Sequence, residues 1–283
     1  MNETPISDVT DTAAWVASYR ARETQRSDAL FKDPLAKVLA GSWGETIAEK
    51  NKTFGAEWYI IIRTHIIDTF ILNALKSGVD AVVNLGAGLD TRPYRLDLPK
   101  DLLWIEVDYP RIIEMKESKL QGESANCRLE RIALDLSLQD KREELLESIN
   151  GRAKKILVLT EGVLPYLTED QVASLAKDLS RQSQIEYWIV DYFAPGMIRT
   201  LGRSTNRKQM QNAPFQFNPS HWNKFFADSG WSLKEMKYML SEGRRLGRNP
   251  PLPALGRLGF RLLPHFLQEK IEHLSGFALL EKS

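Results

Sequence analysis

The stretch VVNLGAGLDTRPYRL (residues 82–96) decides the fold, because it joins an apolar run to a glycine turn. Gly86 and Gly88 have no Cβ, so a ligand can approach this backbone closely, near the N-terminus of the next helix. The nicotinamide dinucleotide fingerprint needs a third glycine three residues after Gly88, where this chain has Thr91. The loop, including Asp90, therefore predicts a cofactor site other than a nicotinamide site, although two glycines alone also fit a tight turn without a ligand.

Outward from this loop, short β-branched runs alternate with helical segments. Five strands are predicted at 80–85, 102–107, 128–134, 154–159 and 184–190, and helices at 110–120, 139–149 and 168–181 separate most of them. Such alternation is typical of βαβ units and a parallel sheet. Two late strands, in WSLKEMKYML and GFALLEKS, predict a Rossmann-like α/β fold with a mixed sheet of about seven strands.

The rest of the chain predicts one domain over residues 1–283. Residues 12–50 indicate helices broken at Asp33-Pro34, and 56–76 indicate one helix ended by Gly78. We expect a helical cap over 1–78, a cofactor-binding core over 79–192, and a substrate-side insertion with the final antiparallel strands over 193–283. The late insertion is where variation for the substrate belongs.

Composition excludes several classes of protein. The net charge of +1 gives no global sign of nucleic acid or membrane binding, and no apolar run is long enough to span a bilayer. The single Cys127 and four scattered histidines predict no metal site. The polar N-terminus has no signal-peptide pattern, so we expect a soluble cytoplasmic protein.

Three predicted strands end in carboxylates, at Asp108, Asp135 and Glu161. Ligands of open parallel sheets bind outside the carboxyl ends of the strands, so these side chains should share the edge with the glycine loop. Asp108 suits a ribose diol, Asp135 suits the amine of adenine, and Glu161 suits a cationic centre. Each alone also fits a helix cap or a solvated loop acid. Glu106 competes for the ribose, but we expect strand alternation to leave only one of the two well aimed, and we prefer Asp108.

Arg63 lies in the middle of the apolar face of the 56–76 helix, with Tyr59, Ile60, Ile66 and Ile67 as its neighbours one turn away. A buried guanidinium needs an anionic partner. The sequence leaves two alternatives open: a bound carboxylate, or an internal salt bridge, for example to Asp90 or Asp108.

Over residues 12–192 the chain resembles the leucine carboxyl methyltransferase family of S-adenosylmethionine-dependent enzymes. The resemblance rests on ARETQRSDALFKDPLA (21–36), VVNLGAGLDTRPYRL (82–96), WIEVDYP (104–110) and LTEGVLPYL (159–167), and the forms at 21–36 and 161–167 look like the bacterial branch. It implies that S-adenosylmethionine is the cofactor. It further implies that Arg63 and Arg22 hold the methionine carboxylate, Gly86 contacts the cofactor through its backbone, and Asp135 and Leu136 flank the adenine.

The expected reaction is methyl transfer to a carboxylate or another acidic oxygen, on a small molecule. A carboxylate acceptor is already ionised and needs no base, whereas a phenol would benefit from one. Tyr166 and His221 are the candidates for that base. The alternatives are a nicotinamide-dependent oxidoreductase and a non-catalytic protein that binds S-adenosylmethionine. Basic residues after strand five and after the penultimate strand suggest an acidic substrate, although solvated surface charge also fits: Arg199, Arg203, Arg207, Lys208, Arg244, Arg245 and Arg248.

Overall fold

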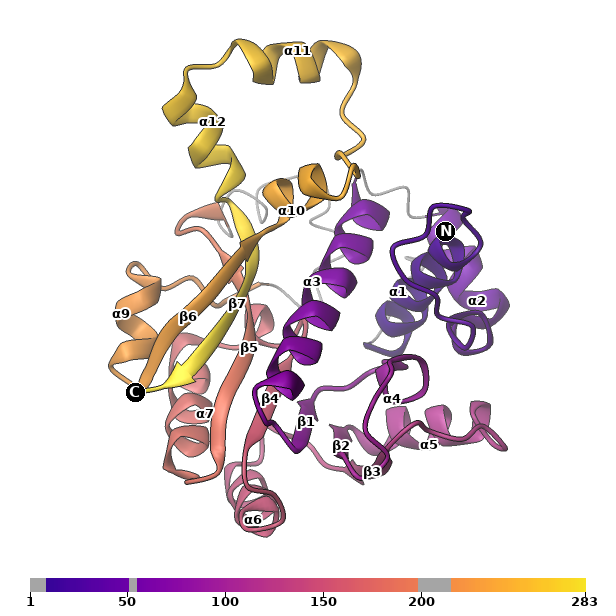
Figure 1. Cartoon of the computed structure of the whole chain (residues 1–283), viewed down its shortest axis with the longest axis vertical. Helices are drawn as coiled ribbons and strands as arrows, with labels where there is room; N and C mark the ends of the chain where they lie inside the picture. Colours follow the sequence, from indigo (N-terminus) through magenta and orange to yellow (C-terminus); the bar gives the residue numbers. More distant parts are fainter. Residues whose placement is uncertain (1–8, 51–54, 198–214) are drawn as a thin grey trace, which may run out of the picture.

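A computed structural model describes residues 9–50, 55–197 and 215–283, without the side chains of Val9, Arg257 and Arg261. Its centre is a seven-stranded sheet in the order β3-β2-β1-β4-β5-β7-β6 (Figure 1). The strands are β1 (Ala81–Leu85), β2 (Leu103–Asp108), β3 (Arg128–Ala133), β4 (Ile156–Thr160), β5 (Ile185–Phe193), β6 (Trp231–Tyr238) and β7 (Ser275–Lys282). The predicted Rossmann-like mixed sheet is confirmed.

The first five strands are parallel, and β7 lies antiparallel between β5 and β6. The strand order reverses after β1, because the chain builds outward to β3 and then returns to place β4 on the other side of β1. Such a switch point opens a crevice at the carboxyl ends of the central strands, where ligands of this architecture bind.

Helices cover both faces of the sheet. On one face lie α6 (Gln139–Ile149), α7 (Glu169–Arg181) and α9 (Trp222–Ala227), packed on side chains such as Val83 and Val158. On the other face α3 (Ala56–Lys76) packs its isoleucines on Val82, Leu157 and Ile189. Successive strand residues point to opposite faces, so these fully buried, mostly apolar central strands fill both cores.

The first two helices lie to one side of the sheet, next to the glycine loop (Figure 1). Helix α1 (Val9–Thr24) packs on α2 (Ala36–Lys50), and both contact Leu89 of the loop and Leu120 after α5 (Pro110–Lys119). Two short helical turns complete the loops, α4 (Arg92–Arg95) after β1 and η1 (Leu164–Tyr166) after β4.

The C-terminal third differs from the sequence expectation in one respect. The Pro- and Gly-spaced stretch after α10 (Met239–Arg245) contains two helices, α11 (Ala254–Leu262) and α12 (His265–Glu272). Leu255 is 83% exposed and Leu262 is exposed as well, so this amphipathic stretch is not packed into the core of the described chain. These helices form an arch away from the sheet (Figure 1).

Candidate functional site

The strand registers place four functional positions side by side across the sheet. Leu85 pairs with Val107, so Gly86 and Asp108 follow at the same level on β1 and β2. Asn84 pairs with Leu159, which puts Gly86 level with Glu161 after β4. Thr160 pairs with Val190, which puts Glu161 level with Asp191 on β5. We call Asp108, Gly86, Glu161 and Asp191 the strand-end row.

Gly86 begins the glycine loop, and its geometry excludes any side chain. Its φ of +75° is a left-handed conformation, and a Cβ there would lie 2.5 Å from Cγ2 of Val163. The Gly86 N–H donates to Val107 O at 2.8 Å, so a ligand contact would run through its carbonyl oxygen. The residues after β1 and β4 are therefore packed tightly against each other at the centre of the row.

Asp108 holds the other end of the same loop. Its Oδ2 accepts from the Gly88 N–H at 2.6 Å, and its Oδ1 accepts from the Tyr109 N–H at 2.7 Å. Burial raises the pKa of Asp108, although these two backbone N–H groups act against the rise. Each carboxylate oxygen retains a second acceptor site, so the side chain can still take two hydroxyl hydrogens.

Glu106 is not available for that role. Strand alternation puts it on the same face as Asp108, so depth along the strand, rather than alternation, separates the two. The Glu106 carboxylate is fully buried and pairs with Lys116 Nζ at 2.7 Å and with Arg131 Nε at 2.9 Å. The ion pairs of Glu106, and not strand alternation, therefore exclude it as the ribose ligand, and the role of Asp108 stays a prediction.

Arg63 forms an internal ion pair, with a partner other than those suggested from the sequence. Its Nε lies 2.7 Å from Glu161 Oε1, without hydrogen-bond geometry, and the two side chains are 13% and 15% exposed. Glu161 Oε2 also accepts from Arg92 Nη1 at 2.7 Å. Burial works to raise the pKa of Glu161, but Arg92 and Arg63 outweigh it and hold the pKa below its usual range. The carboxylate is thus ionised and shared by two cations.

Arg92 continues this network beneath the glycine loop. It donates to Asp90 and Asp68, and Asp68 in turn accepts two bonds from Arg95. Asp90 also accepts from Asn84 Nδ2 and from the Arg92 N–H, so its oxygens serve the loop itself. A direct cofactor contact by Asp90 stays a prediction, since its observed role is to hold the loop and Arg92 together.

Asp191 is the functional candidate that our reading of the sequence missed. It lies on β5, is 4% exposed, and its Oδ2 accepts from the Gly162 N–H at 3.0 Å. Burial raises the pKa of Asp191 to about 7, while Arg63 and the Gly162 N–H act in the opposite direction. The strand-end rule that selected Glu161 would have selected Asp191 too, had it been applied to the fifth strand.

The structure separates the two candidate bases. Tyr166 lies near Arg63 and Asp191, and burial raises its pKa, so its hydroxyl stays protonated at neutral pH and is able to donate a hydrogen bond. Tyr59 on α3 faces the same groups. His221 is exposed at the start of α9, and the described contacts of this cluster do not include it. The structure gives no support to His221 as a base.

Asp135 and Leu136 follow β3, beyond Asp108 on the neighbouring strand. Asp135 Oδ1 caps its own turn by accepting from the Ser137 N–H at 2.9 Å, and the Leu136 carbonyl accepts from Arg142. The ring of Tyr109 is 45% exposed between them and Asp108, and burial, Asp135 and Asp108 together raise its pKa. An exposed ring beside a carboxylate offers a surface on which a planar base can stack.

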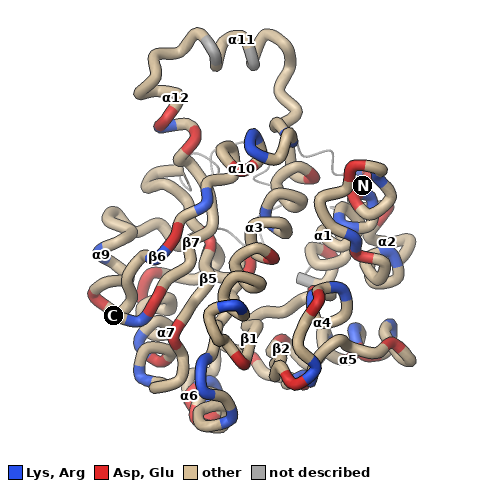
Figure 2. The backbone as a smooth tube through the Cα atoms, in the orientation of Figure 1, with Lys and Arg blue, Asp and Glu red and all other residues tan. Residues whose placement is uncertain are grey.

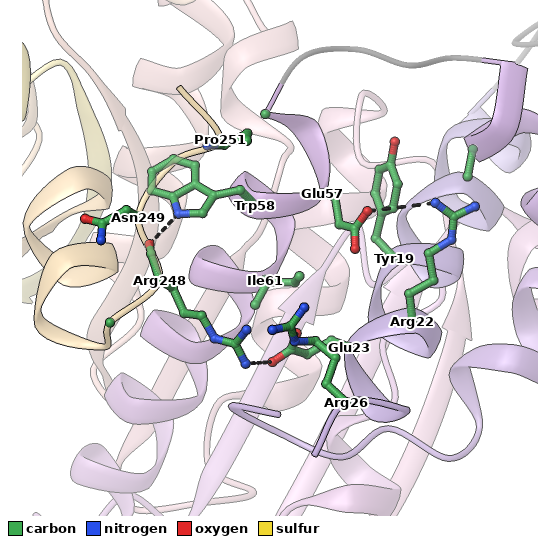
Figure 3. Close-up of a pocket in the computed structure, with 13 residues that line it drawn as sticks. Tyr19, Arg22, Glu23, Arg26, Glu57, Trp58, Ile61, Arg248, Asn249 and Pro251 are labelled. Carbon is green, nitrogen blue, oxygen red and sulfur yellow. Dashed lines mark hydrogen bonds and ion pairs between the residues drawn. The ribbon is translucent and has the colours of Figure 1, made fainter. Parts of the chain in front are cut away.

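Arg22 lies elsewhere, in a pocket of about 520 Å³ between α1, α3 and residues 247–251 (Figure 3). Its Nη1 is 3.8 Å from Glu57 Oε2, and its guanidinium lies over the Tyr19 ring. Arg20 points the other way and donates to Leu89 O in the glycine loop, because residues two apart on a helix face different sides. The proposed contact of Arg22 with a methionine carboxylate stays a prediction that this arrangement does not support.

Positively and negatively charged residues are interspersed along the described chain (Figure 2). Arg244, Arg245 and Arg248 form ion pairs with Glu272, Glu242 and Glu23, while Arg199, Arg203, Arg207 and Lys208 lie outside the described residues. Within the described ranges, no cluster of His, Cys, Asp and Glu could hold a metal. None of the described helices is both long and apolar enough to span a bilayer.

The charges at the sheet edge fit an amino-acid nucleoside. Glu161 offers an anion to an ammonium, Arg63 offers a cation to a carboxylate, and Asp108 offers free acceptor sites to a diol. The buried Arg63 Nε without a hydrogen bond is the unsatisfied donor in this set. The residues present therefore fit S-adenosylmethionine.

Two solved structures have the same fold. A protein of Streptomyces avermitilis from a family of unknown function matches with a TM-score of 0.58 and 12% identity, covering 94% of this chain and 97% of its own. A protein of Thermobifida fusca, named as a candidate methyltransferase, matches with a TM-score of 0.58 and 14% identity, covering 99% and 97%. At this identity the likeness concerns the fold alone.

Sequence relatives extend the comparison. A candidate S-adenosyl-L-methionine-dependent methyltransferase of Streptomyces avermitilis is 36% identical over 187 residues, 62% of this chain and 66% of its own length. A candidate of the same kind from Frankia alni is 27% identical over 259 residues, 86% and 90% of the two chains. The chain thus spans just under two thirds of the S. avermitilis relative. The family model for leucine carboxyl methyltransferase matches residues 13–180, more than half of the sequence. The chain belongs to the leucine carboxyl methyltransferase family.

Proposed function

We propose that this protein is an S-adenosylmethionine-dependent methyltransferase that transfers a methyl group to a carboxylate or another acidic oxygen of a small molecule. The strand-end row carries the proposal. Asp108 lies at one end of the row, Glu161 and Asp191 lie at the other, and Gly86 lies between them. Asp135 follows β3, the strand beyond Asp108. This order follows the order of adenine, ribose and methionine groups along the cofactor. Relatives with the same family motifs are named for this cofactor.

The chain's own residues would supply alignment rather than chemical activation. When bound, S-adenosylmethionine supplies a methyl group that is already activated by the sulfonium. Arg63 and Glu161 would fix the amino-acid end, Asp108 would fix the ribose, and Val163 with Gly86 would close the backbone around the centre. Holding the reacting groups in line and excluding water are the main contributions a protein makes to such a displacement.

Neither of the two candidate bases, Tyr166 and His221, is suited to remove a proton from a hydroxyl acceptor. Tyr166 stays protonated near neutral pH and can donate a hydrogen bond, and His221 is exposed away from the cluster. A carboxylate has a reference pKa near 4 and arrives ionised, so it needs no base. The arrangement thus favours an acidic oxygen over an unactivated hydroxyl.

The nicotinamide alternative conflicts with the loop. Thr91 occupies the position of the third glycine, is fully buried, and donates to Asp33 Oδ2 at 2.6 Å. That position is therefore built as a tertiary contact, whereas the dinucleotide fingerprint needs a glycine there for close packing of the helix on the strand. A non-catalytic protein that binds S-adenosylmethionine remains the second reading, since the row concerns the cofactor and not the acceptor.

Calorimetric titration of the full chain tests the cofactor. We expect binding of S-adenosylmethionine and S-adenosylhomocysteine and none of NAD or NADP, because the loop and the row match the first pair. Binding of NAD without either adenosyl ligand would overturn the proposal. Production of S-adenosylhomocysteine in the presence of small carboxylic acids then separates an enzyme from a binding protein.

Replacing Asp108 should weaken both the cofactor site and its loop. In Asp108→Ala we expect affinity for S-adenosylhomocysteine to fall by about 1.5–3 kcal/mol, because charge-assisted bonds to two hydroxyls are lost. The variant should also unfold more easily than the wild type, since Gly88 and Tyr109 lose the acceptor of their N–H groups. Titration and urea unfolding measure the two effects, and unchanged affinity would assign the ribose elsewhere.

A further inference from the structure

Asp191 is an extra carboxylate beside a charge network that is balanced without it. Ion pairs link Arg63 to Glu161, Glu161 to Arg92, and Arg92 to Asp68. Asp68 pairs in turn with Arg95, which lies 4.0 Å from Asp33, the partner of Arg20 on α1. The members of this network are four arginines, Arg20, Arg63, Arg92 and Arg95, and four acids, Asp33, Asp68, Asp90 and Glu161. Four positive and four negative charges leave a net charge of zero.

Asp191 adds a fifth carboxylate at the end of this network. It is 4% exposed and receives one backbone N–H, from Gly162. The charged and titratable groups that face it are Tyr59 and Arg63 from α3, Glu161 from the residue after β4, and Tyr166 from η1. Arg63, the one cation among them, is already paired with Glu161. A buried carboxylate without its own cation favours the protonated form.

The two forms of the cofactor differ by one positive charge. Both carry a carboxylate and an ammonium, which cancel, but the donor has a sulfonium where the product has a neutral thioether. The sulfonium belongs to the amino-acid end, which the proposed orientation places at the Glu161 and Asp191 end of the row. It is the charge that a fifth carboxylate needs in order to ionise.

We propose that Asp191 distinguishes the methyl donor from its demethylated product, by releasing its proton when the sulfonium ligand binds and keeping it when the thioether ligand binds. This role rests on the proposed function of the site. The step balances: the protonated Asp191 loses one proton to solvent and becomes the counter-ion of the one added positive charge. After methyl transfer the counter-charge is lost, Asp191 takes up a proton again, and the product is held less tightly than the donor.

The consequence for binding has a definite sign. The pKa of Asp191 is raised to about 7 in the protein without ligand, and the sulfonium would lower it. Donor binding therefore strengthens as pH rises toward 7 and then levels off, with proton release below that pH. Product binding should be nearly independent of pH in the same range, because the product adds no net charge.

Calorimetry on the full chain at about pH 6 and about pH 7 tests this, since both values lie below the pKa of an α-amino group, about 8. We expect the affinity for S-adenosylmethionine to rise about fivefold and that for S-adenosylhomocysteine to change less than about twofold. Repeating the titration at pH 6 in two buffers of different ionisation enthalpy should show release of close to one proton with S-adenosylmethionine alone.

Asp191→Asn replaces the titratable carboxyl group with an amide of nearly the same shape. We expect it to abolish the difference in pH dependence between the two ligands. Asp80→Asn is the matched control, because Asp80 also accepts backbone N–H groups, from Lys154 and Lys155, but at the opposite edge of the sheet. The control should behave as wild type. If Asp191→Asn does not fold, the number of protons that the wild type releases on binding each ligand still tests the proposal.

The outcomes separate the two proposals. Failure of both ligands to bind overturns the proposed function. Binding of both with the same pH dependence and no difference in released protons overturns the role of Asp191 and leaves the proposed function intact. A fivefold rise that persists in Asp191→Asn assigns the proton to another group and also overturns it.

Discussion

Arg63→Met should abolish most cofactor binding and leave the empty protein almost as stable as the wild type. Methionine keeps the aliphatic volume, and Glu161 keeps Arg92 Nη1 at 2.7 Å, so no buried carboxylate is left without a cation. The affinity for S-adenosylhomocysteine should fall by about 3 kcal/mol, roughly 100-fold, because a buried carboxylate of the ligand loses its partner. Melting with and without the ligand measures both effects, since a ligand stabilises only the state that binds it.

Arg131→Met provides the matched control. Glu106 is shared by Arg131 and Lys116 as Glu161 is shared by Arg63 and Arg92, but it is buried behind the strand-end row. We expect a similar small change in melting temperature and a normal shift with S-adenosylhomocysteine. If Arg63→Met melted far below Arg131→Met and kept the wild-type ligand shift, Arg63 would be a structural residue.

Gly86→Ala should lower both cofactor affinity and the stability of the fold. The left-handed φ of +75° costs a residue with a Cβ about 1–2 kcal/mol, and overlap with Val163 Cγ2 should add about 1–3 kcal/mol. The residues after β4 would also move, and Glu161 with them, so cofactor affinity should fall together with stability. Urea unfolding and calorimetry of the purified variant measure the two losses.

Two further variants divide this cost into its parts. Gly122→Ala has a comparable φ of +89° with nothing within 4 Å of the added Cβ, so it should show the backbone cost alone. The double variant Gly86→Ala, Val163→Ala removes the atom that the new methyl group would meet. We expect it to recover part of the stability, and an equal loss in Gly122→Ala and Gly86→Ala would contradict the steric account.

Local signals in the sequence predicted most of the elements. The helix over 56–76 was predicted with its observed bounds, because Gly55 and Gly78 flank an uninterrupted apolar periodicity. The predicted 139–149 helix also has its observed bounds. The fifth strand runs past the predicted end at residue 190 to Phe193, since β7 pairs with its last residues, and that pairing is not visible in the local pattern.

The site was predictable in position but not in its pairings. Strand-end carboxylates identified Asp108 and Glu161, because chain topology brings those ends together. The partner of Arg63 was not predictable, because an arginine with several acids in reach pairs according to side-chain packing. Likewise Arg22 and Arg20 differ in role through helix phase, which a motif comparison does not resolve without the position of the glycine loop.

The spacing of the strands also fixes the distance between the two ends of the strand-end row. Neighbouring strands lie about 4.8 Å apart, so the three steps from β2 through β1 and β4 to β5 span roughly 14 Å between Asp108 and Asp191. Backbone hydrogen bonding fixes that length, and side-chain adjustment cannot shorten it. A nucleoside alone or an amino acid alone reaches only one end, whereas a molecule that joins the two can engage both at once and gain the affinity of linked contacts.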